Sequence, residues 1–394
     1  VTAIHNFDLA ALYTKWVQDY FDAQHPVSGY VTDTAPFEGG GGGPAWGAAC
    51  ILVPWQVYLH YGDRRMLERH YAGMKHYLQW MYSQAGPDGT LFCKLPDGKD
   101  TFWLNLGDWC APDKKQPPRD LVHTFFLWRC TDFLARAAAA LGYEGDVCTY
   151  RALAEKTAAA FHEKFYDEGK GSYGPVGGDV FALVMGVPQE RQGRVRQALA
   201  ANMESNGGHL DTGIFGTGFL FEALSDNGCG DLAYGAMDKR TRPSYGWWIE
   251  QGWTTSSEYW EGVASRNHPM FGGGLSWFYR RLVGFEADEA APGYRRILIE
   301  PRPAGGATRA SYATRTPYGD ASAGWEKQEG TLTLFAVVPV GSTARVTLPA
   351  SAKATVEESG LALDRAPGVR VVGRTERALR LETGSGSYRF TVRD

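Results

Sequence analysis

The spacing of apolar residues changes once along this chain, near residue 285, and this change constrains the fold more than any other feature. Before it, apolar residues recur every three or four positions, which places them on one face of an α-helix. Residues 63–83 give the clearest case, with Leu67, Tyr71, Met74, Leu78 and Met81. After it, short alternating runs such as TLTLFAVVP and YRFTVRD are separated by Gly, Pro and Ser, a pattern typical of antiparallel strands. The sequence therefore predicts a helical domain over residues 1–285 and an antiparallel β-sandwich over residues 286–394.

About ten helices are predicted in the first part. They cover residues 4–24, 45–61, 63–83, 119–142, 146–166, 179–186, 188–204, 213–225, 229–239 and 267–283. Residues 45–61 are apolar nearly all round, so we expect this helix to be enclosed on both sides. Long and short loops alternate between the helices, which favours antiparallel hairpins arranged in a ring, with the long loops at one mouth. An irregular helical bundle with solvated loops is the alternative.

The composition excludes several classes of partner. The net charge of −4 comes from interspersed residues, so neither nucleic acid nor a membrane surface is expected to bind. No run of 18 apolar residues predicts a membrane span. The six cysteines are scattered without a C-x-x-C pair, which indicates reduced thiols and favours a cytoplasmic protein. No cofactor is expected, and a calcium ion, although compatible with the sequence, is indicated by no motif.

The stretch QGWTTSSEYWEG, residues 251–262, is the strongest candidate for a functional site. Aromatic residues make up 13% of the chain, and indole rings beside carboxylates suit a carbohydrate site. Glycoside hydrolysis needs two carboxylates, one on each side of the bond, and Glu258 and Glu261 are too close in sequence to serve as that pair. Glu258 is the better candidate because aromatic and hydroxyl side chains surround it. His268, next to Asn267, could hold a sugar hydroxyl.

Other acids have structural explanations that compete with a catalytic one. Asp33 could form a turn, Asp108 could cap a helix or support a loop, and Glu250 could belong to an ion pair. Each of these explanations is favoured over catalysis when the acid is taken alone.

Seven phrases, read in order, resemble the bacterial α-L-rhamnosidases of glycoside hydrolase family seventy-eight over nearly the whole chain. They are FDLAALYTKWVQDYFDAQ, GGGGGPAWGAACILVPWQVYLHYGDRRMLERHY, GDWCAP, HLDTGIFGTGFLFEALSDNG, PSYGWWIEQGWTTSSEYWEG, NHPMFGGGLSWFYRRLVGF and GYRRILIEPRP. The resemblance implies an (α/α)6 barrel followed by a β-sandwich, and hydrolysis of terminal α-L-rhamnose with inversion of configuration.

The resemblance also implies roles for single residues. Glu258 matches the general base, whereas Glu261 matches an acid without a catalytic part. Trp46, Trp109 and His268 match residues of the rhamnose pocket. We also expect substrate contacts from Asp108, Trp248 and Trp260, which lie in the same phrases.

Two departures from the family pattern stand beside this resemblance. The family's general acid belongs to a D-x-x-x-x-R-E motif that precedes the segment resembling residues 4–24, and this sequence does not contain it; Ala48 also replaces a common acid. We therefore expect a piece of a longer rhamnosidase whose first helices and general acid belong to the preceding part. The alternatives are a non-catalytic rhamnoside-binding module, or another (α/α)6 glycosidase or polysaccharide lyase.

Overall fold

The structure, a computed structural model, describes residues 2–37, 39–41, 43–95, 97–99, 101 and 103–393. The chain divides into two compact units. The first contains residues 8–57 and 64–274. The second contains residues 275–394 together with two short segments, 2–7 and 58–63. The apolar spacing gave no sign that these two early segments belong with the strands.

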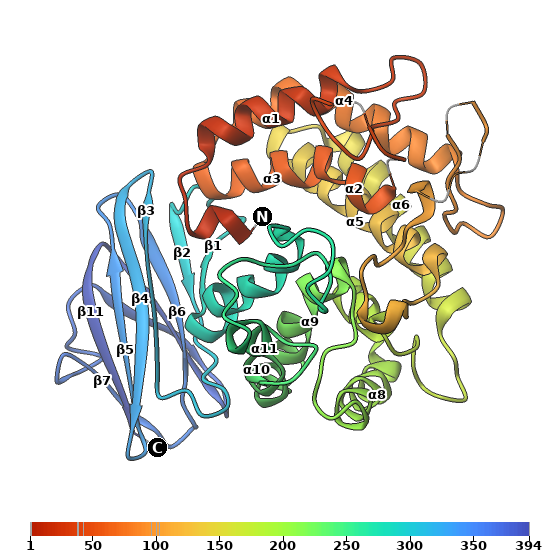
Figure 1. Ribbon diagram of the computed structural model, residues 1–394. Helices are drawn as coiled ribbons and strands as arrows, with labels where there is room; N and C mark the ends of the chain where they lie inside the picture. Colours follow the sequence, from red (N-terminus) through yellow and green to blue (C-terminus); the bar gives the residue numbers. More distant parts are fainter. Residues whose placement is uncertain are drawn as a thin grey trace. The chain divides into compact units, whose positions relative to one another are not determined.

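The first unit is built from helices that follow one another as hairpins (Figure 1). The helices are α1 (Ala10–Asp22), α2 (Pro44–Gly47), α3 (Ala49–Tyr61, whose end lies in segment 58–63), α4 (Arg64–Ser83), α5 (Arg119–Leu141), α6 (Glu144–Phe165), α7 (Gly178–Met185), α8 (Gln189–Ser205), α9 (Ile214–Asp226), α10 (Gly230–Asp238) and α11 (Tyr245–Glu250). Helix α5 packs on α6, α7 on α8 and α9 on α10. Gly142 makes the short α5–α6 turn possible, because its φ of 80° is a left-handed conformation that closes a helix. The expected hairpin architecture is confirmed.

Burial of apolar faces explains why these helices form. All five members of the stripe predicted on residues 63–83 are buried on α4. Helix α5 is buried on most of its surface, including the consecutive residues Leu121 to Leu127. A helix with so little exposed surface lies inside the unit, where packing outweighs intrinsic propensity.

Three predicted helices differ from the observed structure. The segment 4–24 is helical only from Ala10, after a separate 3₁₀ turn at Thr2–His5. The segment 45–61 is interrupted at Ala48, which separates α2 from α3. The segment 267–283 forms a 3₁₀ helix at Pro269–Leu275 and a π-helix at Phe278–Val283, because three consecutive glycines do not favour an α-helix there.

The second unit is a β-sandwich of two sheets. Its strands are β1 (Phe285–Ala287), β2 (Arg296–Ile299), β3 (Arg309–Thr316), β4 (Gly319–Gln328), β5 (Thr331–Val338), β6 (Thr343–Pro349), β7 (Thr355–Glu358), β8 (Leu361–Ala362), β9 (Val369–Arg374), β10 (Ala378–Thr383) and β11 (Gly386–Arg393). The strand orders are β1-β2-β6-β10-β9 and β3-β4-β5-β11-β7-β8. Neighbouring strands are antiparallel except β2 and β6, which run parallel, a pairing that the alternating runs could not reveal. Buried residues alternate along β5 and β6, as predicted for a sheet with one face on a core.

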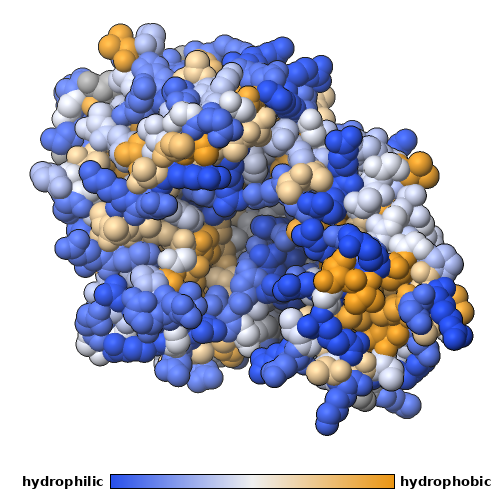
Figure 2. Space-filling view, turned by 180° about the vertical axis from the view of Figure 1, so that it is seen from behind, coloured by the Kyte–Doolittle hydropathy of each residue, from blue (hydrophilic) through white to orange (hydrophobic). Residues whose placement is uncertain are grey.

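The surface agrees with the interspersed charges of the sequence. Figure 2 shows a face on which hydrophilic residues predominate, with apolar residues scattered among them and gathered in one larger patch. Among the described helices, none combines the length and the apolar character needed to cross a membrane.

Candidate active site

The stretch that contains Glu258 is a loop in which two segments face each other. The backbone N–H of Glu258 donates to the carbonyl of Ser265 at 2.8 Å, and the N–H of His268 donates to the carbonyl of Ser256 at 2.9 Å. The hydroxyl of Thr255 donates to the carbonyl of Arg266. These bonds hold residues 255–258 beside residues 265–268, so the predicted base and the predicted sugar-binding histidine are on one loop. We call residues 251–268 the base loop.

Glu258 is half-buried and oriented by its own loop. Its Oε2 accepts the backbone N–H of Ser265 at 3.3 Å. Among the described residues, its Oε1 has no hydrogen-bond partner, so this oxygen can accept a proton from a bound water. A carboxylate with one oxygen held and one oxygen open is able to act as a general base.

Trp248 and Trp260 form the support of the base loop. Their indole rings stack with centroids 4.3 Å apart, and Trp248 Nε1 donates to the carbonyl of Trp260 at 3.3 Å. Phe271 covers Trp260 at 4.5 Å. Trp248 is 5% exposed and Trp260 is fully buried. The structure therefore differs from the expectation that these two rings contact substrate: protein side chains already cover them, and their role here is to carry the loop.

The other glutamate of the stretch, Glu261, belongs to an ion-pair network. Arg242 pairs with Glu261 and also approaches Asp113, with 3.6 Å between Nη2 and the carboxylate oxygen. Asp113 follows the GDWC phrase, so Arg242 connects that segment to the base loop. Glu250 is exposed and pairs with Arg240 at 2.9 Å. These contacts separate Glu258 from its acidic neighbours.

Asp108 is fully buried and fastens its segment to the start of α9. Its carboxylate accepts the backbone N–H groups of Gly213 at 2.8 Å, Phe215 at 2.9 Å and Gly216 at 3.0 Å. Burial raises the pKa of Asp108 to about 7, although the three N–H groups favour the charged form. The first N–H groups of a helix lack acceptors within the helix, and the Asp108 carboxylate is the acceptor here. The predicted contact between this carboxylate and a sugar remains a prediction, while its structural role is clear.

Trp109 and Trp46 meet at the same helix end. The N–H of Ile214 donates to the carbonyl of Trp109 at 2.9 Å, so the backbone of Trp109 is fixed to the first residue of α9. Trp46, on α2, packs edge to face on Phe215 with centroids 4.8 Å apart. Both tryptophans are partly exposed. The structure therefore places these two predicted pocket residues around one helix terminus.

A side-chain interaction joins the tryptophan segment to the base loop. The Tyr259 hydroxyl, one residue after Glu258, interacts with the Cys110 thiol, one residue after Trp109. Burial raises the pKa of the Cys110 thiol to about 12, and burial together with the thiol raises the pKa of Tyr259 to about 12. Both groups are therefore neutral near pH 7, and the contact is structural. With it, Glu258, Trp109 and Trp46 belong to one connected region.

Four of the eight described non-glycine residues with a positive φ lie in the same two segments. Cys110, Asp113 and Lys114 have φ values of 59°, 53° and 58°, and Ala264 of the base loop has 59°. Residues with a side chain adopt this left-handed region at a cost in free energy, and they occur where surrounding contacts impose that conformation, often at functional sites.

Sequence reasoning missed Arg242, Phe215 and the Cys110–Tyr259 pair, because their importance depends on contacts across distant parts of the chain.

Comparisons with known proteins show the family to which the chain belongs. The family model of the bacterial alpha-L-rhamnosidase 6 hairpin glycosidase domain matches residues 1–282, and that of the bacterial alpha-L-rhamnosidase C-terminal domain matches residues 284–362. A curated alpha-L-rhamnosidase of Streptomyces avermitilis is 33% identical over 99% of this chain and 37% of its own length.

Two solved structures have the same fold over this length. An alpha-L-rhamnosidase from Dictyoglumus thermophilum superposes with a TM-score of 0.89 and 32% identity, covering 100% of this chain and 44% of its own. The Streptomyces avermitilis enzyme, solved in complex with L-rhamnose, gives a TM-score of 0.84 and 30% identity over 98% of this chain and 36% of its own. The chain thus spans about two fifths of the length of the relatives it matches.

Proposed function

This chain belongs to the bacterial α-L-rhamnosidases, and from that membership we propose that its helical unit hydrolyses terminal α-L-rhamnosides with inversion of configuration, Glu258 acting as the general base. The observation that carries the proposal is the half-buried Glu258 carboxylate, with Oε2 held by Ser265 and Oε1 open. In the proposed step, Oε1 takes a proton from water while the water oxygen attacks the anomeric carbon. The bond to the aglycone oxygen breaks, and that oxygen leaves with a proton from a general acid.

The substrate site proposed for rhamnose contains Trp46, Trp109 and His268. The indole faces would cover the C–H surface of the sugar, including its methyl group, and the imidazole would bind a hydroxyl. Partial exposure of all three side chains supports this assignment. We propose rhamnose-containing glycosides or oligosaccharides as the substrate class.

The general acid is proposed to come from a polypeptide segment other than these 394 residues. The motif that supplies it in the resembling family is not in the sequence. Without the acid, expulsion of an alkoxide loses assistance worth on the order of 10² to 10⁴ in rate. A phenolate with a low pKa leaves without that assistance, so the chain alone is expected to retain activity only on such substrates.

A cytoplasmic location is likewise proposed, supported by six cysteines that form no disulfide among the described residues.

The test compares two substrates and one variant. The chain should hydrolyse 2,4-dinitrophenyl α-L-rhamnoside far better than methyl α-L-rhamnoside, and Glu258→Gln should abolish both reactions while L-rhamnose still quenches tryptophan fluorescence. Proton NMR of the first turnovers should show β-L-rhamnose, the inverted anomer. Retained hydrolysis in Glu258→Gln would remove Glu258 from the role. Rhamnose binding without hydrolysis of either substrate would instead favour a non-catalytic binding module.

A further inference from the structure

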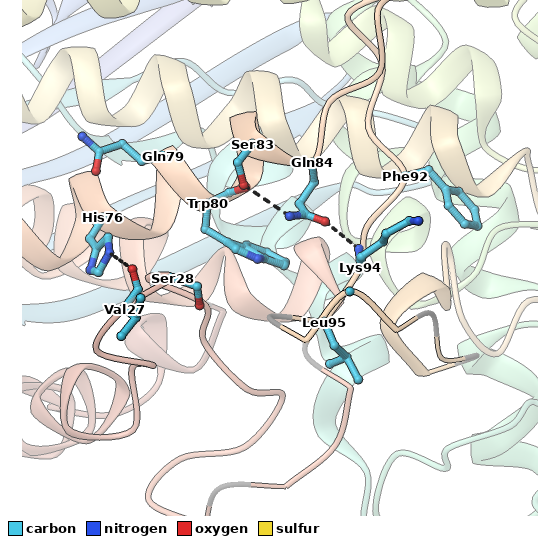
Figure 3. A pocket seen from close by; sticks show the side chains of 11 residues that line it. Val27, Ser28, His76, Gln79, Trp80, Ser83, Gln84, Phe92, Lys94 and Leu95 are labelled. Carbon is cyan, nitrogen blue, oxygen red and sulfur yellow. Dashed lines mark hydrogen bonds between the residues drawn. The ribbon is translucent and has the colours of Figure 1, made fainter.

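A groove on the helical unit lies among residues that take no part in the proposed active site (Figure 3). Its volume is about 660 Å³, within the range of small-molecule pockets. Four side chains of α4 line it: His76, Gln79, Trp80 and Ser83. Their spacing of three, four and seven residues places them on one face of the helix. The groove therefore presents polar groups from one face of this helix, with the buried indole of Trp80 beneath them.

The two walls of the groove are fixed to this helix. On one side, Gln24 Nε2 donates to the carbonyls of Gly29 at 2.9 Å and Gly73 at 3.0 Å, and His76 Nε2 lies 3.3 Å from the carbonyl of Val27. On the other side, the N–H of Lys94 donates to Gln84 Oε1 at 2.8 Å, a bond drawn in Figure 3. The groove is thus held by hydrogen bonds between separate segments.

The lining offers donors in excess and no carboxylate. Gln79 and Lys94 are exposed, and within the described part of the chain their side chains have no hydrogen-bond or ion-pair partner. The Gln84 amide donates to Ser83 at 3.2 Å and keeps a second N–H. A cation without a partner, in a chain of net charge −4, favours an anionic ligand at this position.

Apolar side chains border the same groove. Phe92 is 50% exposed and Val27 is 83% exposed. An exposed ring beside amides and hydroxyls suits the alternating C–H and O–H surface of a sugar. A surface with charged groups alone would not offer a contact for the C–H groups. We propose that this groove is an accessory site for an acidic oligosaccharide, with a uronate carboxylate at Lys94, a sugar face on Phe92, and hydroxyls at Gln79 and Ser83. The site is independent of hydrolysis at Glu258.

Calorimetric titration of the unmodified chain with tetragalacturonate tests the proposal. We expect saturable binding that persists in excess L-rhamnose and weakens about fivefold or more in Lys94→Gln and in Phe92→Ala, as loss of a charged hydrogen bond or a stacked ring predicts. The matched control is Lys170→Gln, which removes an exposed lysine from a turn that does not line the groove and should leave binding unchanged.

Several results would overturn the proposal. Equal affinity in Lys94→Gln, Phe92→Ala and the unmodified chain would show that tetragalacturonate binds elsewhere, and no saturable binding would refute the site outright. Displacement by L-rhamnose would assign the binding to the proposed active site. Equally tight binding of tetraglutamate would mean that charge alone is recognised. Hydrolysis of aryl rhamnosides should be the same in all three variants. Failure of the accessory site in these titrations is therefore distinct from failure of the proposed function.

Discussion

Two glycines at the ends of the QGWTTSSEYWEG stretch allow a controlled test of how tightly the base loop is packed. Gly252 and Gly262 have φ values of 72° and 74°, so both are in the left-handed region. A Cβ on Gly252 would meet no atom within 4 Å, whereas a Cβ on Gly262 would lie 2.0 Å from the ring of Trp253. The substitutions Gly252→Ala and Gly262→Ala therefore share the cost of a left-handed backbone, and Gly262→Ala adds a steric clash.

The shared cost is the left-handed backbone, about 1–2 kcal/mol for a residue with a Cβ. Gly262→Ala adds a steric cost because Trp253 is confined: Trp247 packs on it at 5.3 Å and the Arg266 guanidinium lies 4.9 Å above it. Overpacking of this kind costs about 1–3 kcal/mol. We expect a loss in the free energy of unfolding of about 1–2 kcal/mol for Gly252→Ala and about 2–5 kcal/mol for Gly262→Ala.

Thermal unfolding followed by calorimetry measures the difference. At about 2–4 °C per kcal/mol for a unit of this size, the melting temperature of the helical unit should fall by about 2–8 °C in the control and further in Gly262→Ala. Hydrolysis of 2,4-dinitrophenyl α-L-rhamnoside should decrease mainly in Gly262→Ala, since Trp253 and Glu258 share the loop. Equal melting temperatures in the two variants would refute the reasoning, because they would show that Trp253 moves aside freely.

Three further predictions concern the contacts around the base loop. Arg242→Gln breaks the bridge from Glu261 to Asp113 and should lower kcat about tenfold, with less than about 1 kcal/mol lost in the free energy of unfolding. Arg240→Gln breaks a comparable exposed ion pair and should change neither kcat nor stability. Equal kinetics in the two variants would show that the bridge does not contribute to catalysis. Asp108→Ala leaves three buried N–H groups without partners and should cost at least about 3 kcal/mol in urea unfolding, a loss that a mere surface role would not produce. Burial raises the pKa of Asp108 from 3.8 to about 7, so its contribution to stability is complete below pH 3.8 and is lost as pH rises through 7. From about pH 5 to pH 8, the urea midpoint should therefore fall less in Asp108→Asn than in the unmodified chain. The same pH profile in both proteins would contradict this prediction.

The fold could be predicted largely from periodicity. The stripe on α4 and the alternation on β5 are repeated local signals, each reinforced over several residues. The failures occur where local signals are weak or conflicting: the glycines of Pro269–Leu275, the break at Ala48, and the parallel pairing of β2 with β6, which is a choice between distant strands.

The site could be predicted only in part, and the reason is physical. Glu258 was selected from its neighbours in sequence, and its role as base stays a prediction; the contact that orients its carboxylate comes from Ser265, seven residues further on. Trp260 has equally suggestive neighbours, yet it is fully buried, and no local pattern distinguishes a ring that supports a loop from a ring that faces a ligand. Asp108 shows the same limit, since its three partners lie more than a hundred residues away.

The supporting contacts also explain how strained backbone persists beside the proposed base. Cys110 and Asp113 have left-handed φ values, and each takes part in a contact with another segment. The Cys110 thiol interacts with the Tyr259 hydroxyl, and Arg242 approaches the carboxylate of Asp113. Because left-handed residues cost about 1–3 kcal/mol each, such a segment would relax if those contacts were absent. An inverting reaction needs a water held between a base and the sugar, and displacements of about 1 Å can cost about a hundredfold in rate. If Glu258 is the base, these contacts should affect the rate through the positions of Trp109 and Glu258, and we therefore expect the Arg242 variant to lose rate before it loses stability.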